Sequence, residues 1–103
     1  MFEAPQLDDA GKVLVAAADL IKEKGFWAGP VKEPNRGERL CAAYAMQIVV
    51  CPTQLFTDKE QQLYQKALGR LQRHVNEPLI PTWNDSHTAE EVMTTLREAA
   101  YNK

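Results

Sequence analysis

The residues of this chain best suited to covalent chemistry are a cysteine and two histidines. Cys41 falls in the first turn of a predicted helix, where the helix dipole lowers a thiol pKa. His74 or His87 could act as its base, with Asn84 or Asp85 orienting the imidazole. The immediate neighbours of Cys41 are apolar, however, as they are around a packed structural thiol. A small thiol-dependent enzyme using Cys41 is therefore an alternative interpretation, behind a structural cysteine.

No metal site and no cofactor are predicted. Zinc sites place their cysteines or histidines at short spacings, and the two cysteines and two histidines of this chain have no such spacing. The phosphate-binding loop, the dinucleotide fingerprint and the serine elbow are also missing from the sequence. The paired carboxylates Asp8-Asp9 and Glu90-Glu91 stand at predicted helix starts, where negative charge is favourable, and are interpreted as caps.

Size and charge narrow the classes of function. The 103 residues fit one domain, residues 1–103, and the 12 basic against 14 acidic residues give a net charge of −2. A nucleic-acid binder usually carries a basic excess, so nucleic acid is not the expected partner. Weak nucleic-acid binding through Arg70, Arg73, His74 and Arg97 is kept as a second alternative.

The expected location is the cytoplasm. Residues 1–5 lack the basic and apolar regions of a signal peptide. The longest apolar run, residues 40–50, is too short for a membrane span, which needs about 20 residues. Ten residues of helix between Cys41 and Cys51 would separate the two thiols too far for a disulfide, so both are expected to be reduced.

The elements that must position these side chains are helices. Apolar residues at helical spacing and capping signals predict an all-α fold, a compact bundle of about four helices with one long Gly/Pro-containing loop, residues 25–37, between the first two. The predicted helices are residues 9–24, 38–50, 58–75 and 88–101.

Two segments carry more detailed predictions. The helix at residues 38–50 is apolar on nearly every side, which is typical of a central, buried helix. Prolines bracket residues 77–82, which predicts an extended connection with Leu79 and Ile80 folded back onto the core.

Aromatic residues in the irregular segments are the candidates for recognition. Trp27 and Trp83 are both predicted to lie in loops just outside helices, where each would close one end of the small core. The alternative is that one of them stays partly exposed as an interface anchor, because Trp, Tyr and Arg dominate binding hot spots. The candidate binding residues are Trp27, Arg36, Arg39, Trp83, Asn84, Asp85 and Tyr101.

Several blocks of the sequence resemble a known family. They are residues 14–21, Gly25-Phe26-Trp27, residues 39–45, Trp83-Asn84-Asp85 and residues 96–100. Together they are similar to a family of small proteins from actinobacteria and their phages, catalogued as a domain of unknown function. The family pattern usually has a glycine where this chain has Tyr44, and its connection between the first two helices is often longer and richer in aspartate.

The resemblance implies an architecture and a source but no activity. With no convincing catalytic set and a nearly neutral charge, the sequence favours a non-enzymatic protein-binding or regulatory module. The expected partner is another protein, from a phage or its host, and a homodimer is also possible. No membrane partner is expected.

Overall fold

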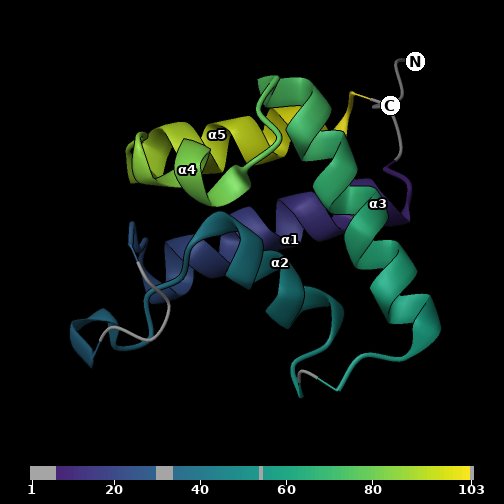
Figure 1. Ribbon diagram of the computed structural model, residues 1–103, viewed down its shortest axis with the longest axis horizontal. Helices are drawn as coiled ribbons and strands as arrows, with labels where there is room; N and C mark the ends of the chain where they lie inside the picture. The colour runs from purple at the N-terminus through teal and green to yellow at the C-terminus, as the bar shows by residue number, and fades with distance from the viewer. Residues whose placement is uncertain (1–6, 30–33, 54, 103) are drawn as a thin grey trace, which may run out of the picture.

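Five α-helices and one short 3₁₀ turn make up the protein in its computed structural model (Figure 1), which describes residues 7–29, 34–53 and 55–102. The elements are α1 (Asp9–Lys24), η1 (Pro34–Arg36), α2 (Ala42–Val50), α3 (Asp58–Val75), α4 (Ile80–Asp85) and α5 (Ala89–Ala100). These residues contain no strand, only an isolated parallel bridge between Phe26 and Leu40. The predicted all-α class is confirmed. The amino-terminal residues considered for a signal peptide, and residues 30–33 of the long connection, lie outside the described ranges.

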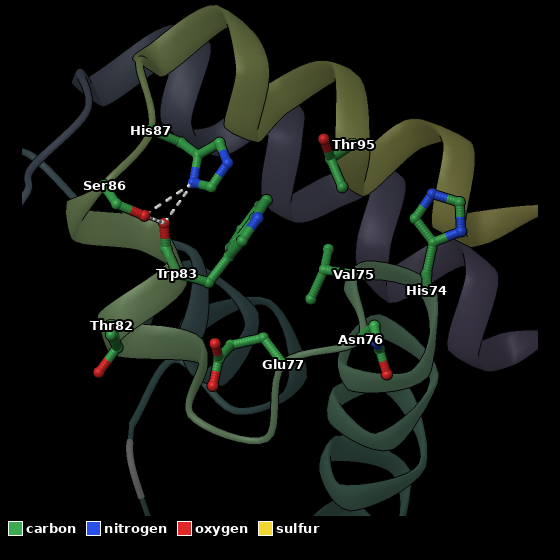
Figure 2. Close-up of a pocket in the computed structure, with 9 residues that line it drawn as sticks. All are labelled: His74, Val75, Asn76, Glu77, Thr82, Trp83, Ser86, His87 and Thr95. Atoms are coloured by element: carbon green, nitrogen blue, oxygen red, sulfur yellow. Dashed lines mark hydrogen bonds between the residues drawn. The ribbon is translucent and has the colours of Figure 1, made fainter.

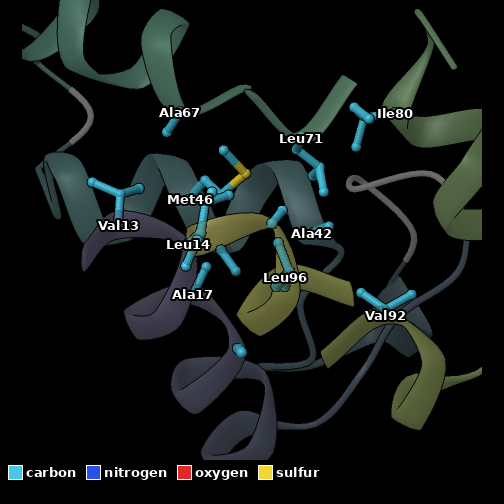
Figure 3. Packing of buried hydrophobic residues seen from close by; sticks show 14 of the residues in the cluster. Val13, Leu14, Ala17, Ala42, Met46, Ala67, Leu71, Ile80, Val92 and Leu96 are labelled. Atoms are coloured by element: carbon cyan, nitrogen blue, oxygen red, sulfur yellow. The ribbon is translucent and has the colours of Figure 1, made fainter. Parts of the chain in front are cut away.

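Helix α1 is the centre of the packing. It contacts α5, α2 and α3, and the other helices are arranged around it (Figure 1). Figure 3 shows the core that results, with side chains from all five helices meeting in one cluster. Its labelled members are Val13, Leu14, Ala17, Ala42, Met46, Ala67, Leu71, Ile80, Val92 and Leu96. Alanines in α1, α2 and α3 bring the helix backbones close together, because a small side chain leaves room for a neighbouring helix.

The predicted boundaries of three helices are confirmed within a residue, because local capping determines them. The carboxylate of Asp8 accepts the N–H of Gly11 and begins α1, and Gly25, with a φ of 100°, ends it. Thr57 and Thr88 each form a complete capping box with the glutamate three residues further on, at the starts of α3 and α5.

Helix α2 starts four residues later than predicted, at Ala42 instead of residue 38. Leu40 is bound by a neighbouring segment instead: its N–H donates to Gly25 and its carbonyl accepts from Trp27, at 2.8 and 2.9 Å. A residue whose backbone is paired in this way cannot also propagate a helix. Cys41 is consequently the N-cap residue of α2 and does not lie in its first turn.

The predicted extended connection at residues 77–82 is wrong in its second half. Ile80 to Asp85 form the short helix α4, which places Trp83 inside a helix and not in a loop. Pro81 is compatible with the first turn because that turn needs no N–H from it and favours its fixed φ. Ile80 is buried as predicted, but Leu79 is 62% exposed, so its predicted return to the core is also wrong.

The composition of α2 predicted a helix buried on every side, and this prediction is wrong. Only Ala42, Ala45 and Met46 of its nine residues are buried. The remaining six are only partly covered, namely Ala43, Tyr44, Gln47, Ile48, Val49 and Val50. Helix α2 therefore keeps one side partly open to solvent.

An ion pair between a buried arginine and a partly exposed aspartate joins the two ends of the chain. Arg70 of α3 is 5% exposed and donates from its two terminal nitrogens to the Asp8 carboxylate at 2.7 and 2.5 Å. It also donates to the carbonyl of Ala100 at 3.2 Å. The hydrogen bonds to Asp8 are the main reason that the Arg70 pKa is raised. This cluster fixes the start of α1, the middle of α3 and the end of α5 together.

Among the described residues, no helix combines the length and the apolar character needed to cross a bilayer.

Candidate functional site

Asn84 organises the surface around the start of α2. Its side chain is completely buried at the end of α4. Its Oδ1 accepts the N–H of Ala42 at 2.9 Å, and its Nδ2 donates to the carbonyl of Trp27 at 3.0 Å. The first N–H groups of a helix have no partner within the helix, and the Cys41 side chain makes no cap bond here. Asn84 supplies that cap from a distant part of the sequence.

Asp85 extends the same network to the surface. Its Oδ1 accepts the N–H of Gly29 at 3.0 Å and the Nδ2 group of Asn84 at 3.2 Å. The carboxylate is exposed and thus lies at the edge of the site. Together Asn84 and Asp85 attach the segment around Trp27 to α4 and to the start of α2.

A cleft of about 500 Å³ lies beside this network. Its lining consists of Gly29, Cys41, Ala43, Tyr44, Gln47, Pro81 and Asp85. Cys41 is 8% exposed, and burial is the main cause that raises the pKa of its thiol. A raised pKa leaves less thiolate at neutral pH, so burial here opposes nucleophilic chemistry.

A second cleft, of about 270 Å³, lies on the other side of Tyr44. This cleft lies between the end of α1, the end of η1 and α2. Its lining consists of Leu20, Lys24, Arg36, Gly37, Glu38, Leu40, Tyr44 and Ile48. Tyr44 therefore lines both clefts. We call the partly exposed side of α2, namely Ala43, Tyr44, Gln47 and Ile48 with these two clefts, the α2 face.

Two arginine–aromatic pairs lie next to the α2 face. The guanidinium of Arg39 lies over the Trp27 ring, 4.6 Å from its centroid, and that of Arg36 lies over the Tyr44 ring at 5.2 Å. Arg36 also donates to the carbonyl of Arg39 at 2.7 Å, and Arg39 donates back to the carbonyl of Arg36 at 3.0 Å and to that of Asn35. Each arginine is thus held by a ring and by backbone oxygens.

Both histidines line a different pocket, of about 470 Å³, between the end of α3, α4 and α5 (Figure 2). Nδ1 of His87 donates to the Trp83 carbonyl at 2.6 Å, and its ring lies 5.1 Å from the Trp83 ring. His74 contacts the Asn102 amide at 3.0 Å. Cys41 lies in another cleft, so the thiol and imidazoles considered for catalysis are not assembled into one site.

Side chains that could bind a metal ion are dispersed over the described residues. In the described part of the chain, no group of three or more histidine, cysteine, aspartate or glutamate side chains is arranged to hold a metal ion.

The structure brings together most of the residues proposed for binding. Trp27, Arg36, Arg39, Asn84 and Asp85 all lie around the start of α2. Asn84 and Asp85 act there mainly by holding backbone segments in place.

The other two proposed residues lie apart from this group. Trp83 is 7% exposed and packs in the core, while Tyr101, 54% exposed, ends α5. The sequence interpretation missed Tyr44 and Gln47, because an apolar helix was taken to be buried; two polar side chains within that run were the available signal.

The basic residues considered for nucleic-acid binding form no common exposed surface. Arg70 is buried against Asp8, and Arg97 is paired with Asp19 at 2.7 Å. An arginine already paired with a carboxylate offers little attraction to phosphate.

Comparison with known proteins agrees with the resemblance seen in the sequence. The model of a family of unknown function (DUF6197) matches residues 5–102, which is nearly the whole chain. No curated protein and no solved structure matches the chain. The chain belongs to this family of unknown function, DUF6197.

Proposed function

We propose that this chain is a non-enzymatic protein-binding module and that the α2 face is its binding surface. The observation that carries the proposal is the partial exposure of one side of α2. Helix α2 has no charged residue, and six of its nine residues are only partly buried, so part of their surface faces solvent. Exposed apolar surface between polar rims is typical of interaction sites in small proteins.

The rigidity of the α2 face supports the same function. Asn84 and Asp85 fix the backbone on one side, and the two arginine–aromatic pairs fix it on the other. A surface that is already ordered loses little conformational entropy on binding, which favours affinity. Tyrosine, tryptophan and arginine are also the residues that most often dominate binding energy.

The thiol-dependent alternative has weaker support. Burial raises the pKa of Cys41, and neither histidine lines its cleft. A module that binds without chemistry requires neither group.

Source, location and oligomeric state complete the proposal. The resemblance supports an actinobacterial or phage source, and two buried free cysteines are compatible with a reducing cytoplasm. Another protein is the proposed partner, and a second copy of the chain is the alternative occupant of the α2 face.

Site-specific photo-crosslinking tests this function. A benzophenone amino acid would replace Tyr44 on the α2 face in one variant and Thr94, exposed on α5, in a matched control. Both would be irradiated in an extract of the organism that encodes the chain, after circular dichroism has confirmed their folding. The proposal predicts a discrete adduct from position 44 and none from position 94. An adduct with twice the chain mass would identify a second copy as the occupant. Adducts from position 94 alone, or from neither position, would contradict the proposal.

A further inference from the structure

We infer that the pocket between the end of α3, α4 and α5 binds a small, neutral ligand that carries several hydroxyl groups, the chemistry of a sugar (Figure 2). We call this opening the Trp83 pocket. It holds about 470 Å³, within the range of about 300–1,000 Å³ that is typical of small-molecule sites. It shares no lining residue with the two clefts of the α2 face, so this inference goes beyond the proposed function and does not depend on it.

The feature that points to a ligand is the indole nitrogen of Trp83. Trp83 is 7% exposed, and every hydrogen bond that it makes among the described residues comes from its backbone. In the described side chains, the one fully enclosed nitrogen or oxygen atom without a hydrogen bond is Nε of Arg70, so the unbonded indole nitrogen is open to solvent. Figure 2 shows this nitrogen on the side of the ring toward His87 and Thr95. A buried indole N–H usually finds an acceptor, and a ligand oxygen in the pocket would supply it.

His87 presents an acceptor close to this donor. Its Nδ1 lies 2.6 Å from the Trp83 carbonyl oxygen, which can only accept, so Nδ1 carries the proton. Nε2 of the neutral ring is therefore an acceptor, and Figure 2 shows it turned away from that carbonyl, toward the side of Thr95. The imidazole and indole rings lie 5.1 Å apart, so the donor and the acceptor border the same space.

The opposite sides of the pocket add two more polar groups. Thr95 contributes its hydroxyl from α5, which both donates and accepts. Glu77, just after α3, accepts the Leu79 N–H at 3.3 Å with one carboxylate oxygen and keeps the other as an acceptor. A hydroxyl group donates one hydrogen bond and accepts two, so a ligand with several hydroxyls matches this mixture of donors and acceptors.

The charge of the lining favours a neutral ligand. No lysine or arginine is among the described residues that line the Trp83 pocket, and Glu77 places a carboxylate there. His74, at the far end, is bound through Nδ1 to the Asn102 amide. An anion would lose its hydration here beside a like charge and without a lysine or arginine to replace the water.

The composition and the ring geometry favour hydroxyl groups over a planar or apolar ligand. Seven of the nine lining residues are polar, and the other two are Val75 and Trp83. A nucleobase would need an open aromatic face on which to stack. Trp83 is too deeply buried to offer one, because it is 7% exposed and its ring packs against His87.

Two-dimensional NMR of the ¹⁵N-labelled chain tests the inference, because each indole N–H gives its own resonance. A Trp27→Phe variant assigns the Trp83 resonance by elimination and leaves the pocket unchanged. The probes are glucose, galactose, mannose and ribose, with inorganic phosphate and adenosine for comparison. Thr95→Val removes the pocket hydroxyl and keeps the shape of the side chain. Thr94→Val is the matched control, because Thr94 lies exposed at the adjacent position of α5 and does not line this pocket.

The inference predicts that at least one of the four sugars shifts the Trp83 indole resonance saturably and leaves the Trp27 resonance in place. Thr95→Val should weaken this binding about threefold to tenfold, the effect of one lost hydrogen bond, and Thr94→Val less than about twofold. No shift with any of the four sugars, a larger response to phosphate or adenosine, or equal effects of the two substitutions would overturn it. The position-44 crosslink is a separate readout, so the proposed function stands or fails independently of these results.

Discussion

The amide oxygen of Asn84 lies 2.9 Å from the backbone nitrogen of Ala42 and caps helix α2 from the end of helix α4. The same side chain donates to the Trp27 carbonyl, so one buried amide joins three segments that are far apart in the sequence. The α2 face depends on this connection, because Trp27 and Cys41 are positioned through it.

Replacing Asn84 with leucine is expected to destabilise the protein strongly. The substitution removes a buried hydrogen bond to the Ala42 N–H and a part-buried one to the Trp27 carbonyl, and an unsatisfied buried group costs about 1–3 kcal/mol. We expect urea unfolding to show a loss of about 3 kcal/mol. Asp85→Asn, at an exposed neighbouring position, should cost less than about 1 kcal/mol. Equal stability of the Asn84→Leu variant and the unchanged chain would show that the buried amide does not join these segments.

Substitution by alanine is expected to have opposite effects on stability at two glycines. A Cβ on Gly11 would lie 2.6 Å from the carbonyl oxygen of Ala100, a backbone atom that also accepts from Arg70. Gly11→Ala should therefore lower the free energy of unfolding by about 1–3 kcal/mol. In α3, Gly69 has only the flexible end of Arg73 nearby, at 3.5 Å, so Gly69→Ala should raise stability by about 0.5–1 kcal/mol. Thermal unfolding of both variants tests these two expectations. Stabilisation by Gly11→Ala would refute the close approach of Gly11 to the Ala100 carbonyl.

The two capping boxes predict a loss of stability in acid. Hydrogen bonds from Thr57 and Thr88 lower the pKa of Glu60 and Glu91 below the ordinary value of 4.5. A lowered folded-state pKa gives stability that is complete above the ordinary value and is lost as the pH falls through the folded-state value.

The measurement compares the chain with a Glu60→Gln, Glu91→Gln double variant, in which glutamine keeps the capping geometry without titrating. Between about pH 5 and about pH 3 the unchanged chain should lose more stability than the double variant. Parallel curves for the two proteins would show that the boxes contribute nothing to acid sensitivity.

Cys41 is expected to react slowly. Burial raises its pKa, so less thiolate is present at neutral pH than in a free cysteine. In a Cys51→Ala background, iodoacetamide should label the folded chain more slowly than it labels glutathione, and labelling should accelerate in urea. Faster labelling of the folded chain than of glutathione would support the alternative that the protein is a thiol-dependent enzyme.

Local signals in the sequence predicted most of the helix boundaries. Asp8, Thr57 and Thr88 cap their helices with side chains three residues or fewer from the bonded groups, and Gly25 ends α1 through its own backbone. Interactions of this range can be read from a single sequence.

Long-range interactions explain where the structure differs from the sequence predictions. The start of α2 is set by the pairing of Leu40 with the segment around Phe26, and its cap comes from Asn84, 42 residues away. Helix α4 forms where two prolines suggested an extended segment. The partial exposure of Tyr44 follows from how few elements cover α2, which composition alone cannot indicate. The candidate site was therefore only partly predictable: its arginines and Trp27 were identified, but the helix face between its two clefts was not.

Chemical-shift mapping is the most direct test of the α2 face as the binding surface. The ¹⁵N-labelled chain would be titrated with the partner captured by the position-44 crosslink. We predict the largest amide shifts at Ala43, Tyr44, Gln47 and Ile48, with smaller changes through Asn84 to Trp27. Shifts concentrated instead on the exposed side of α5, around Thr94 and Glu98, would contradict the account.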